Sequence, residues 1–271
     1  MVQHIIVPVD GSEESWRALD TAIALARRVD DTSVDVVEVV FDPSDTGAAQ
    51  LRLTERVAQH SISGLTVNTK VEVATDSVAA AVAALVDQHP EATVVMASHG
   101  RGRSAALLGS VAEDLLQRIY GPLVVVGPKA TTTDFSGPIV ITVDGSHASE
   151  SVLPLAAAWG IELGADPWIV EVTDPNTVTP SDIPESAYPG RLARQLSRDS
   201  GHPVNFEVLH GKHVHDEVAD LASGMDASLI VASTHGRTGV SRFTIGSTAA
   251  AFVRHAPCPV LLIRPPHLTT S

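Results

Sequence analysis

The sequence predicts an α/β protein of two tandem domains, each built on a doubly wound sheet of five parallel strands. Three observations support this prediction. Blocks from the first half of the 271-residue chain return in the second half, short apolar runs alternate with helical patterns, and several of those runs are apolar at every position. Strands that are apolar on both faces are typical of a parallel sheet covered by helices on either side.

The repeat is clearest near the two ends of the duplicated unit. Residues Ile5–Ser12 match Ile139–Ser146 at a shift of 134, and Gly109-Ser110 matches Gly246-Ser247 at a shift of 137. A slowly growing shift indicates small insertions or deletions inside one duplicated unit. The chain is therefore predicted to contain two copies of one fold.

Two polar stretches mark connections between the predicted elements. Residues 129–138 are rich in threonine and end in Gly-Pro, which suits a short exposed linker, so we predict domains at residues 1–133 and 134–271. Residues 174–189 are rich in proline and lie between a strand and a helix, where we expect a loop insertion. The equivalent region of the first unit, around 41–48, is shorter.

Each unit alternates strands with amphipathic helices. In the first unit the strands are expected near Ile5–Val9, Val34–Val40, Val67–Val73, Thr93–Ala97 and Leu123–Val126. Apolar residues recur at helical spacing at Trp16, Leu19, Ile23 and Ala26, and in the second unit at Val152, Leu155, Trp159 and Leu163. The predicted order is βαβαβαβαβ, a fold that binds ligands beyond the carboxyl ends of its strands, where the strand order reverses.

The composition describes an ordinary globular protein and excludes several classes of partner. Hydrophobic residues make up 44% of the chain and there is one cysteine, Cys258, so a disulfide framework is excluded. A formal net charge of −14 repels polyanions and argues against nonspecific binding of nucleic acid or acidic lipid. The N-terminal segment lacks a signal-peptide pattern and no apolar run reaches membrane-spanning length, so we expect a cytoplasmic protein.

A glycine-bearing loop follows the fourth strand of each unit and ends in Gly-Ser before an amphipathic helix. The loops cover residues 97–110 and 233–247. Glycine permits close approach of the backbone, and a helix N-terminus presents unpaired N–H groups and the positive end of the helix dipole, so phosphate groups suit this position. Gly-Ser also serves as an ordinary turn and helix cap, so both interpretations stay open.

Asp10 and Asp144 end the first strand of their units. A carboxylate at this place can accept hydrogen bonds from the hydroxyl groups of a ribose. It can equally form an Asx turn with the Gly-Ser that follows it. The sequence leaves these two roles open.

Several motifs recur or stand at matching positions in the two units. They are Val-x-Val-Asp-Gly-Ser after the first strand, the strand ending Val37-Glu-Val39, Ser98-His-Gly, Gly109-Ser-Val and the segment His255–Val260. Together they resemble the universal stress protein family over nearly the whole chain. The resemblance implies Rossmann-like domains of the adenine-nucleotide-binding α/β type and a regulatory role in stress responses. It also implies ATP as the ligand, with or without Mg²⁺, and AMP or cyclic AMP are the alternatives.

The resemblance also assigns roles to individual residues. Asp10 and Asp144 would hold the ribose, and the backbones of Val39 and Val172 would meet the adenine edge. The phosphates would be wrapped by Gly100, Gly109, Ser110 and Val111, and by Gly236, Gly246, Ser247 and Thr248. The family's first loop glycine is replaced by Ala97 and Ser233, which are small enough to leave room for the backbone. Arg101 and Arg237 would offset phosphate charge, and a plain exposed role is their alternative.

The spacing within the two loops differs. In the ATP-binding branch of the family, nine residues separate the second glycine from Gly-Ser or Gly-Thr. Nine residues separate Gly236 from Gly246, but only eight separate Gly100 from Gly109. We therefore predict unequal sites, with the C-terminal one binding ATP more tightly.

Two further features receive structural interpretations. The cluster His210, His213 and His215, followed by Asp216 and Glu217, is placed in a strand-to-helix connection without a counterpart in the first unit, and no metal site is predicted there. Cys258 lies between two prolines before an apolar strand, where packing is expected rather than nucleophilic catalysis.

The residues favour a nucleotide-binding regulatory protein over an enzyme, and no catalytic residue is predicted. Neither loop contains the P-loop pattern with its Lys-Ser/Thr, no Gly-x-Ser-x-Gly elbow occurs, and the loops carry no paired acid and base. Hydrolysis is therefore expected to be slow or absent. A low-rate ATPase or nucleotidyl-transferring enzyme is one alternative, and a scaffold with degenerate sites is another.

The two units are expected to pack against each other as an intramolecular pseudo-dimer. Each ends in an apolar strand, Leu123–Val126 or Val260–Ile263, and the edge of such a strand needs covering. Single-domain members of the resembled family pair through this last strand, and a homodimer of the tandem chain is a further expectation.

Overall fold

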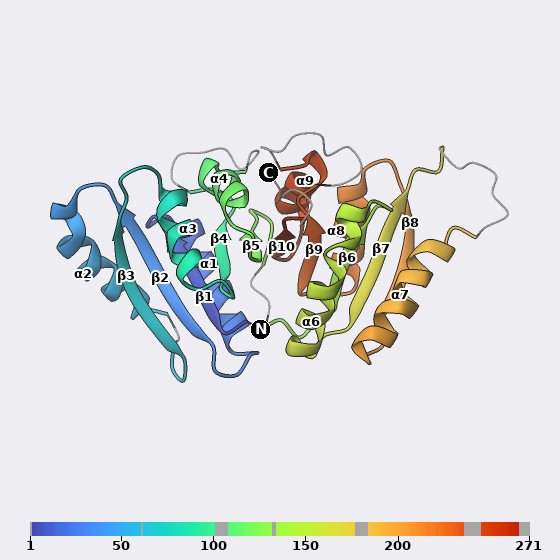
Figure 1. The fold of residues 1–271 in the computed structure, drawn as a ribbon, viewed down its shortest axis with the longest axis horizontal. Helices are drawn as coiled ribbons and strands as arrows, with labels where there is room; N and C mark the ends of the chain where they lie inside the picture. The colour runs from blue at the N-terminus through green and yellow to red at the C-terminus, as the bar shows by residue number, and fades with distance from the viewer. Residues whose placement is uncertain are drawn as a thin grey trace.

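The computed structural model describes residues 2–60, 62–100, 108–131, 134–176, 184–235 and 245–265. The strands of this described part form a ten-stranded sheet in the order β3-β2-β1-β4-β5-β10-β9-β6-β7-β8 (Figure 1). The predicted α/β class is confirmed.

The elements of the two halves follow the same order. The first half contains β1 (His4–Val9), α1 (Glu13–Ala26), β2 (Ser33–Val40), the 3-10 turn η1 (Pro43–Asp45), α2 (Thr46–Val57), β3 (Thr66–Val73), α3 (Val78–Gln88), β4 (Thr93–Ala97), α4 (Ser110–Arg118) and β5 (Leu123–Val126). The second contains β6 (Ile139–Val143), α5 (His147–Glu150), α6 (Leu153–Leu163), β7 (Pro167–Thr173), α7 (Ala187–Ser200), β8 (Asn205–His210), α8 (Val214–Gly224), β9 (Leu229–Ser233), α9 (Ser247–His255) and β10 (Val260–Ile263).

All strand pairs within each half are parallel, in the order 3-2-1-4-5 and its repeat 8-7-6-9-10. The order reverses between β1 and β4, and again between β6 and β9. The doubly wound, five-stranded parallel sheet predicted for each unit is therefore confirmed. The five strands expected in the first unit begin within one residue of the observed strands.

Helices cover both faces of the shared sheet, so its central strands are apolar on both sides, whereas the edge strands β3 and β8 contain no buried residue. One hydrophobic core joins α1, α2, α6 and α7 to the sheet and includes Trp16, Leu53 and Trp159. The other core joins α3, α4, α8 and α9 to the opposite face and includes Leu115 and Phe252. Each core runs through both halves of the chain.

The halves meet where β5 and β10 pair antiparallel, so each last strand covers the edge that the other would expose. Contacts away from the sheet reinforce this junction. The Arg28 guanidinium donates to the Leu163 carbonyl oxygen at 2.7 Å, and the Arg264 guanidinium donates to the Gln117 carbonyl oxygen at 2.6 Å. A Cβ atom on Gly127 would lie 1.9 Å from the Val253 carbonyl oxygen, so only glycine fits the approach of β5 to α9.

The connection between the halves is less exposed than the sequence predicts. Ala130 is buried, Phe135 is fully buried in the first core, and the Thr131 N–H donates to the Pro257 carbonyl oxygen at 2.9 Å. The expectation of an exposed linker was wrong at Ala130 and Phe135, because these side chains pack into the first core at the junction. As predicted, the segment is exposed at Lys129, Thr131, Asp134 and Ser136. Residues 132–133 lie outside the described part.

One other expectation needs correction. The proline-rich insertion extends to Ser186 rather than to Pro189, because Pro189 lies in the first turn of α7, where a missing N–H leaves no helical hydrogen bond unmade. The helix expected from the stripe that begins at Val152 is α6, with Val152 as its N-cap residue and Pro154 in its first turn. Among the described helices, none combines the length and apolar character needed to cross a bilayer.

His4 is a partly buried histidine at the start of β1. Its Nδ1 atom lies 2.9 Å from the Ser33 hydroxyl, its Nε2 atom lies 3.3 Å from an Asp35 carboxylate oxygen, and its ring stacks on His89 at 4.3 Å between centroids. Burial lowers the pKa of His4 below its ordinary value of 6.5, although Asp35 acts in the opposite direction. The imidazole is therefore held in its neutral form more firmly than in the unfolded chain.

Candidate functional site

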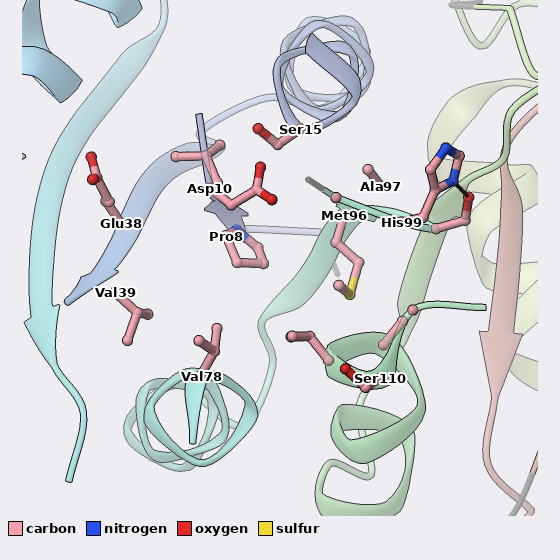
Figure 2. A pocket seen from close by; sticks show the side chains of 16 residues that line it. Pro8, Asp10, Ser15, Glu38, Val39, Val78, Met96, Ala97, His99 and Ser110 are labelled. Carbon is pink, nitrogen blue, oxygen red and sulfur yellow. Dashed lines mark hydrogen bonds between the residues drawn. The ribbon is translucent and has the colours of Figure 1, made fainter. Parts of the chain in front are cut away.

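A cavity of about 390 Å³ opens in the first half at the carboxyl ends of β1, β2 and β4. It lies at the point where the strand order reverses, which is where doubly wound sheets bind ligands. Figure 2 shows the lining side chains around this space. The cavity is lined by Pro8, Val9, Asp10, Ser15, Glu38, Val39, Val78, Met96, Ala97, Ser98, His99, Gly100, Gly109, Ser110, Val111 and Ala112.

The structure brings the predicted site residues of the first half together around this one cavity. Those that line it are Asp10, Val39, Ala97, Gly100, Gly109, Ser110 and Val111. They come from three strand ends and the start of α4, so only the fold makes them neighbours. Arg101 lies outside the described residues.

Asp10 forms the Asx turn that the sequence allows. Its Oδ1 atom accepts hydrogen bonds from the Ser12 N–H at 2.9 Å and from the Ser12 hydroxyl at 2.6 Å. Gly11, between them, has a φ of 79°, which favours glycine. The other oxygen, Oδ2, lies so close to Gly100 that a Cβ atom there would be 2.1 Å away from it. The turn thus orients the carboxylate toward the glycine loop.

The N-terminus of α4 is formed without a side-chain cap. Gly109 is the N-cap residue with φ −65° and ψ 146°, and as a glycine it provides no side-chain cap. Ser110 is already the first helical residue, so the serine of Gly-Ser does not cap the helix. The Gly109 N–H donates to the Ser98 carbonyl oxygen at 2.6 Å, which fixes the helix start against the end of β4. The first-turn residues Ser110, Val111 and Ala112 line the cavity, where their backbone N–H groups suit an anion.

Apolar side chains line another part of the cavity. Val39, Val78 and Met96 surround the space below Asp10 in Figure 2. Met96 is the fourth residue of β4, and Val78 begins α3 directly after the Ser77 cap, whose hydroxyl accepts from the Ala80 N–H at 3.1 Å. The cavity therefore combines an apolar part, a carboxylate and a helix N-terminus.

Sequence reasoning missed several residues of the lining. Pro8, Val78 and Met96 belong to apolar runs and carry no signal that separates lining from core. His99 had such a signal, because Ser98-His99 returns as Thr234-His235 in the second half. In both halves the hydroxyl oxygen lies beside the histidine Nδ1 atom, at 2.9 Å and 3.0 Å.

The second half repeats the same backbone arrangement. Asp144 accepts from the Ser146 N–H at 3.0 Å and the Ser146 hydroxyl at 2.5 Å, and Gly145 has a φ of 80°. Gly246 caps α9 with φ −60° and ψ 145° and no side-chain hydrogen bond, and its N–H donates to the Thr234 carbonyl oxygen at 2.8 Å. The difference in loop length therefore leaves the two helix starts alike.

The remaining predicted residues of the second half fall on matching elements. Val172 lies near the end of β7 and Ser233 is the last residue of β9, where its hydroxyl accepts from the His235 N–H at 3.3 Å. Ser247 and Thr248 are the first two residues of α9. Gly236 and Arg237 lie outside the described residues.

The halves differ on the far side of the Asx turn. In the first half, a second cavity of about 380 Å³ lies there, lined by Asp10, Gly11, Glu13, Trp16, Glu38, Arg52, Leu53 and Arg56. In the second half, Tyr188 from α7 lies beside Gly145, Glu150 and Glu171 in the corresponding place, where burial and the neighbouring Glu150 raise the pKa of its hydroxyl group. The surroundings of the two aspartates are therefore not identical.

The family model described as the universal stress protein family matches residues 1–127 and 136–264. The chain belongs to the universal stress protein family. The resemblance seen in the motifs is thereby confirmed, and the two matches agree with the duplicated fold.

Similar proteins include whole-length tandem members of the family. Over 295 residues the chain is 28% identical to a universal stress protein of Mycolicibacterium smegmatis, with 96% of this chain and 97% of that protein covered. It is 29% identical over 296 residues to a universal stress protein of Mycobacterium tuberculosis, with 97% of each covered. A universal stress protein from Archaeoglobus fulgidus has the same fold, with a TM-score of 0.69 at 16% identity over 97% of this chain and 99% of that one.

Proposed function

We propose that this universal stress protein binds an adenine nucleotide, ATP, in the cavity beside Asp10 and at the equivalent place beside Asp144. In this proposal it acts as a cytoplasmic regulator in stress responses, with slow hydrolysis or none. The observation that carries the proposal is the convergence of three complementary surfaces on one cavity. They are an apolar part, an oriented carboxylate and a helix N-terminus without a side-chain cap.

Each surface suits one part of the nucleotide. The side chains of Val78 and Met96 suit the faces of an adenine ring, and the backbone of Val39, which also lines the cavity, is proposed to meet the adenine edge. The Asp10 carboxylate suits ribose hydroxyl groups. The N–H groups at the start of α4 suit phosphate, which the charge of −14 on the whole chain would otherwise repel. Arg101 and Arg237 remain proposed partners of the phosphates.

Slow hydrolysis is proposed because the described lining offers positioning groups and few groups able to activate water. Oδ1 of Asp10 already accepts two hydrogen bonds from Ser12, and the Glu38 carboxylate pairs with Arg52 at 3.2 Å. The His99 Nδ1 atom is engaged with the Ser98 hydroxyl at 2.9 Å. A general base needs a free acceptor directed at the attacking water.

The test begins with the protein as purified. It is denatured, and the released small molecules are identified by mass spectrometry, which separates ATP from AMP and cyclic AMP. Calorimetric titration with ATP, AMP and cyclic AMP then gives affinity and stoichiometry. We expect ATP to bind best. Release of no nucleotide together with no measurable heat for any of the three would instead favour a scaffold with degenerate sites.

Paired variants link binding to the helix starts. Gly109→Asp and Gly246→Asp each place a carboxylate at a proposed phosphate position, and the double variant should lose ATP binding. The matched control is the double variant Gly47→Asp and Gly224→Asp, since a Cβ atom at either position meets nothing within 4 Å. Equal loss of binding in the control would show a general effect of added charge and would contradict the proposed site.

A further inference from the structure

A cluster of metal-ligating side chains lies between α8 and α9, away from the cavity already described. His215 and Asp216 are in the first turn of α8, and His255 is the last residue of α9. The two helices pack side by side on one face of the sheet (Figure 1). One ligand atom from each of the three side chains lies within 4.8 Å of the other two.

The arrangement within the cluster suits a shared ligand. The His215 and His255 rings have centroids 4.6 Å apart and are tilted by 52°, and the His215 Nε2 atom lies 3.6 Å from an Asp216 carboxylate oxygen. The His213 ring is 5.9 Å from the His215 ring. His210, which the sequence grouped with these residues, instead lies 3.4 Å from Glu185. The decisive partner is His255, which is forty residues away from His215 in the sequence.

The same junction in the first half has different chemistry. The last residue of α4 is Arg118, the counterpart of His255. Its Nε atom donates to Asp114 at 2.8 Å, and its guanidinium lies 3.7 Å from Asp76 before α3. Duplication thus produced one junction closed by an arginine and carboxylates. The other junction has two imidazoles and a carboxylate in place of the arginine.

We propose that His215, Asp216 and His255 form a binding site for a divalent transition metal of the zinc class, which ties α8 to α9. Two imidazoles and a carboxylate are a ligand set that Zn²⁺ and its neighbours accept, with a further position left for water or for another side chain. Bonds of about 2.0–2.2 Å to a tetrahedral ion place ligand atoms roughly 3.5 Å apart, so a movement on the order of 1 Å by partly exposed side chains closes the site.

The surroundings of His255 affect a bound cation in opposite ways. The carbonyl end of α9 carries the negative end of a helix dipole and favours a cation beside His255. Lys129 and Arg254 also act electrostatically on His255 and oppose a bound cation. The proposed nucleotide site begins at Ser247, at the other end of this nine-residue helix, roughly 12 Å away at about 1.5 Å per residue. The metal site is therefore independent of the proposed nucleotide site.

The experiment uses the full chain without an affinity tag, after removal of metal with a chelator. Zn²⁺ affinity and stoichiometry are measured by competition with a chromophoric chelator, and Co²⁺ provides a visible spectrum that reports coordination. We expect one tight site per chain. His255→Gln, His215→Gln and Asp216→Asn should each weaken it by at least tenfold to a hundredfold, a loss that even outer-shell partners of zinc ligands can cause. Lys129→Gln should tighten it.

His210→Gln and His202→Gln are the matched controls, because both residues are exposed histidines of the same half outside the cluster. Zn²⁺ should raise the melting temperature of the parent and of both controls but not of the three ligand variants. Asp216 has a side chain 54% exposed, so Asp216→Asn keeps the test valid even where a histidine variant fails to fold. Unchanged Zn²⁺ binding in His255→Gln or Asp216→Asn, or an equal loss in a control, would overturn the proposal and assign the metal to scattered surface histidines.

Discussion

Replacing Gly100 with alanine tests the proposed role of Asp10 most directly. A Cβ atom at Gly100 would lie 2.1 Å from the Asp10 Oδ2 atom, more than an ångström inside ordinary contact. The φ of Gly100 is outside the left-handed region, so its backbone accepts alanine and only the space is lacking. The added methyl group must therefore move the carboxylate or the loop.

The magnitude follows from what the carboxylate is proposed to bind. The Asp10 side chain is held by two hydrogen bonds from Ser12, so a displaced Oδ2 either breaks that turn or leaves the ribose position. Losing one or two hydrogen bonds to a charged group, at about 1.5–3 kcal/mol each, weakens binding by at least roughly tenfold. We expect that loss in ATP affinity at the first site.

The assay is calorimetric titration with ATP in a Gly246→Asp background, which isolates the first site. Gly47→Ala in the same background is the matched control, because it changes glycine to alanine in a helix where nothing lies within 4 Å. Parent-like ATP affinity in Gly100→Ala would refute the assignment of Asp10 to the ribose. An equal loss in the control would point to general destabilisation instead.

Four further predictions concern the two sites, turnover and stability. Gly246→Asp should remove the tighter ATP site, and Gly109→Asp should remove a site that binds ATP at least about tenfold more weakly. Titrations in which Gly109→Asp removes the tighter site would show that the two sites were ranked wrongly. ATP turnover by protein freed of contaminating ATPases should stay below about 1 per second, and a faster rate that follows the protein would establish an enzyme. Gly127→Ala should lower the unfolding free energy by at least about 1–3 kcal/mol, because its Cβ would lie 1.9 Å from the Val253 carbonyl oxygen, and an unchanged melt would contradict this packing. Burial lowers the pKa of His4, so below pH 6.5 the unfolded chain binds more protons than the folded one and the unfolding free energy decreases as the pH falls. In denaturation curves recorded at several pH values, the unfolding free energy of His4→Gln should decrease less steeply with falling pH than that of the parent. An equal decrease in both proteins would contradict this role of His4.

Local patterns were sufficient for most of the fold. The strands predicted for the first unit begin within one residue of the observed strands. The runs Thr93–Ala97 and Leu123–Val126 were recognisable because a strand buried on both faces tolerates few polar side chains. The Asx turns at Asp-Gly-Ser could also be predicted as one of two roles of the aspartates, since a turn of three neighbouring residues depends on their own conformations. The duplication itself indicated that both units share one topology. These features depend on residues that are close in the sequence.

Contacts between distant residues needed the tertiary structure. The sequence could not show that Phe135 fills a buried place in the junction, or that Val78 and Met96 line a cavity at the edge of the core, because an apolar side chain looks the same in both settings. It also grouped His215 with His210, its neighbour in the chain, whereas the packing of α8 on α9 gives it His255 as a partner. Sequence spacing determines which residues share an element. Only the packing of elements decides which side chains from different elements meet.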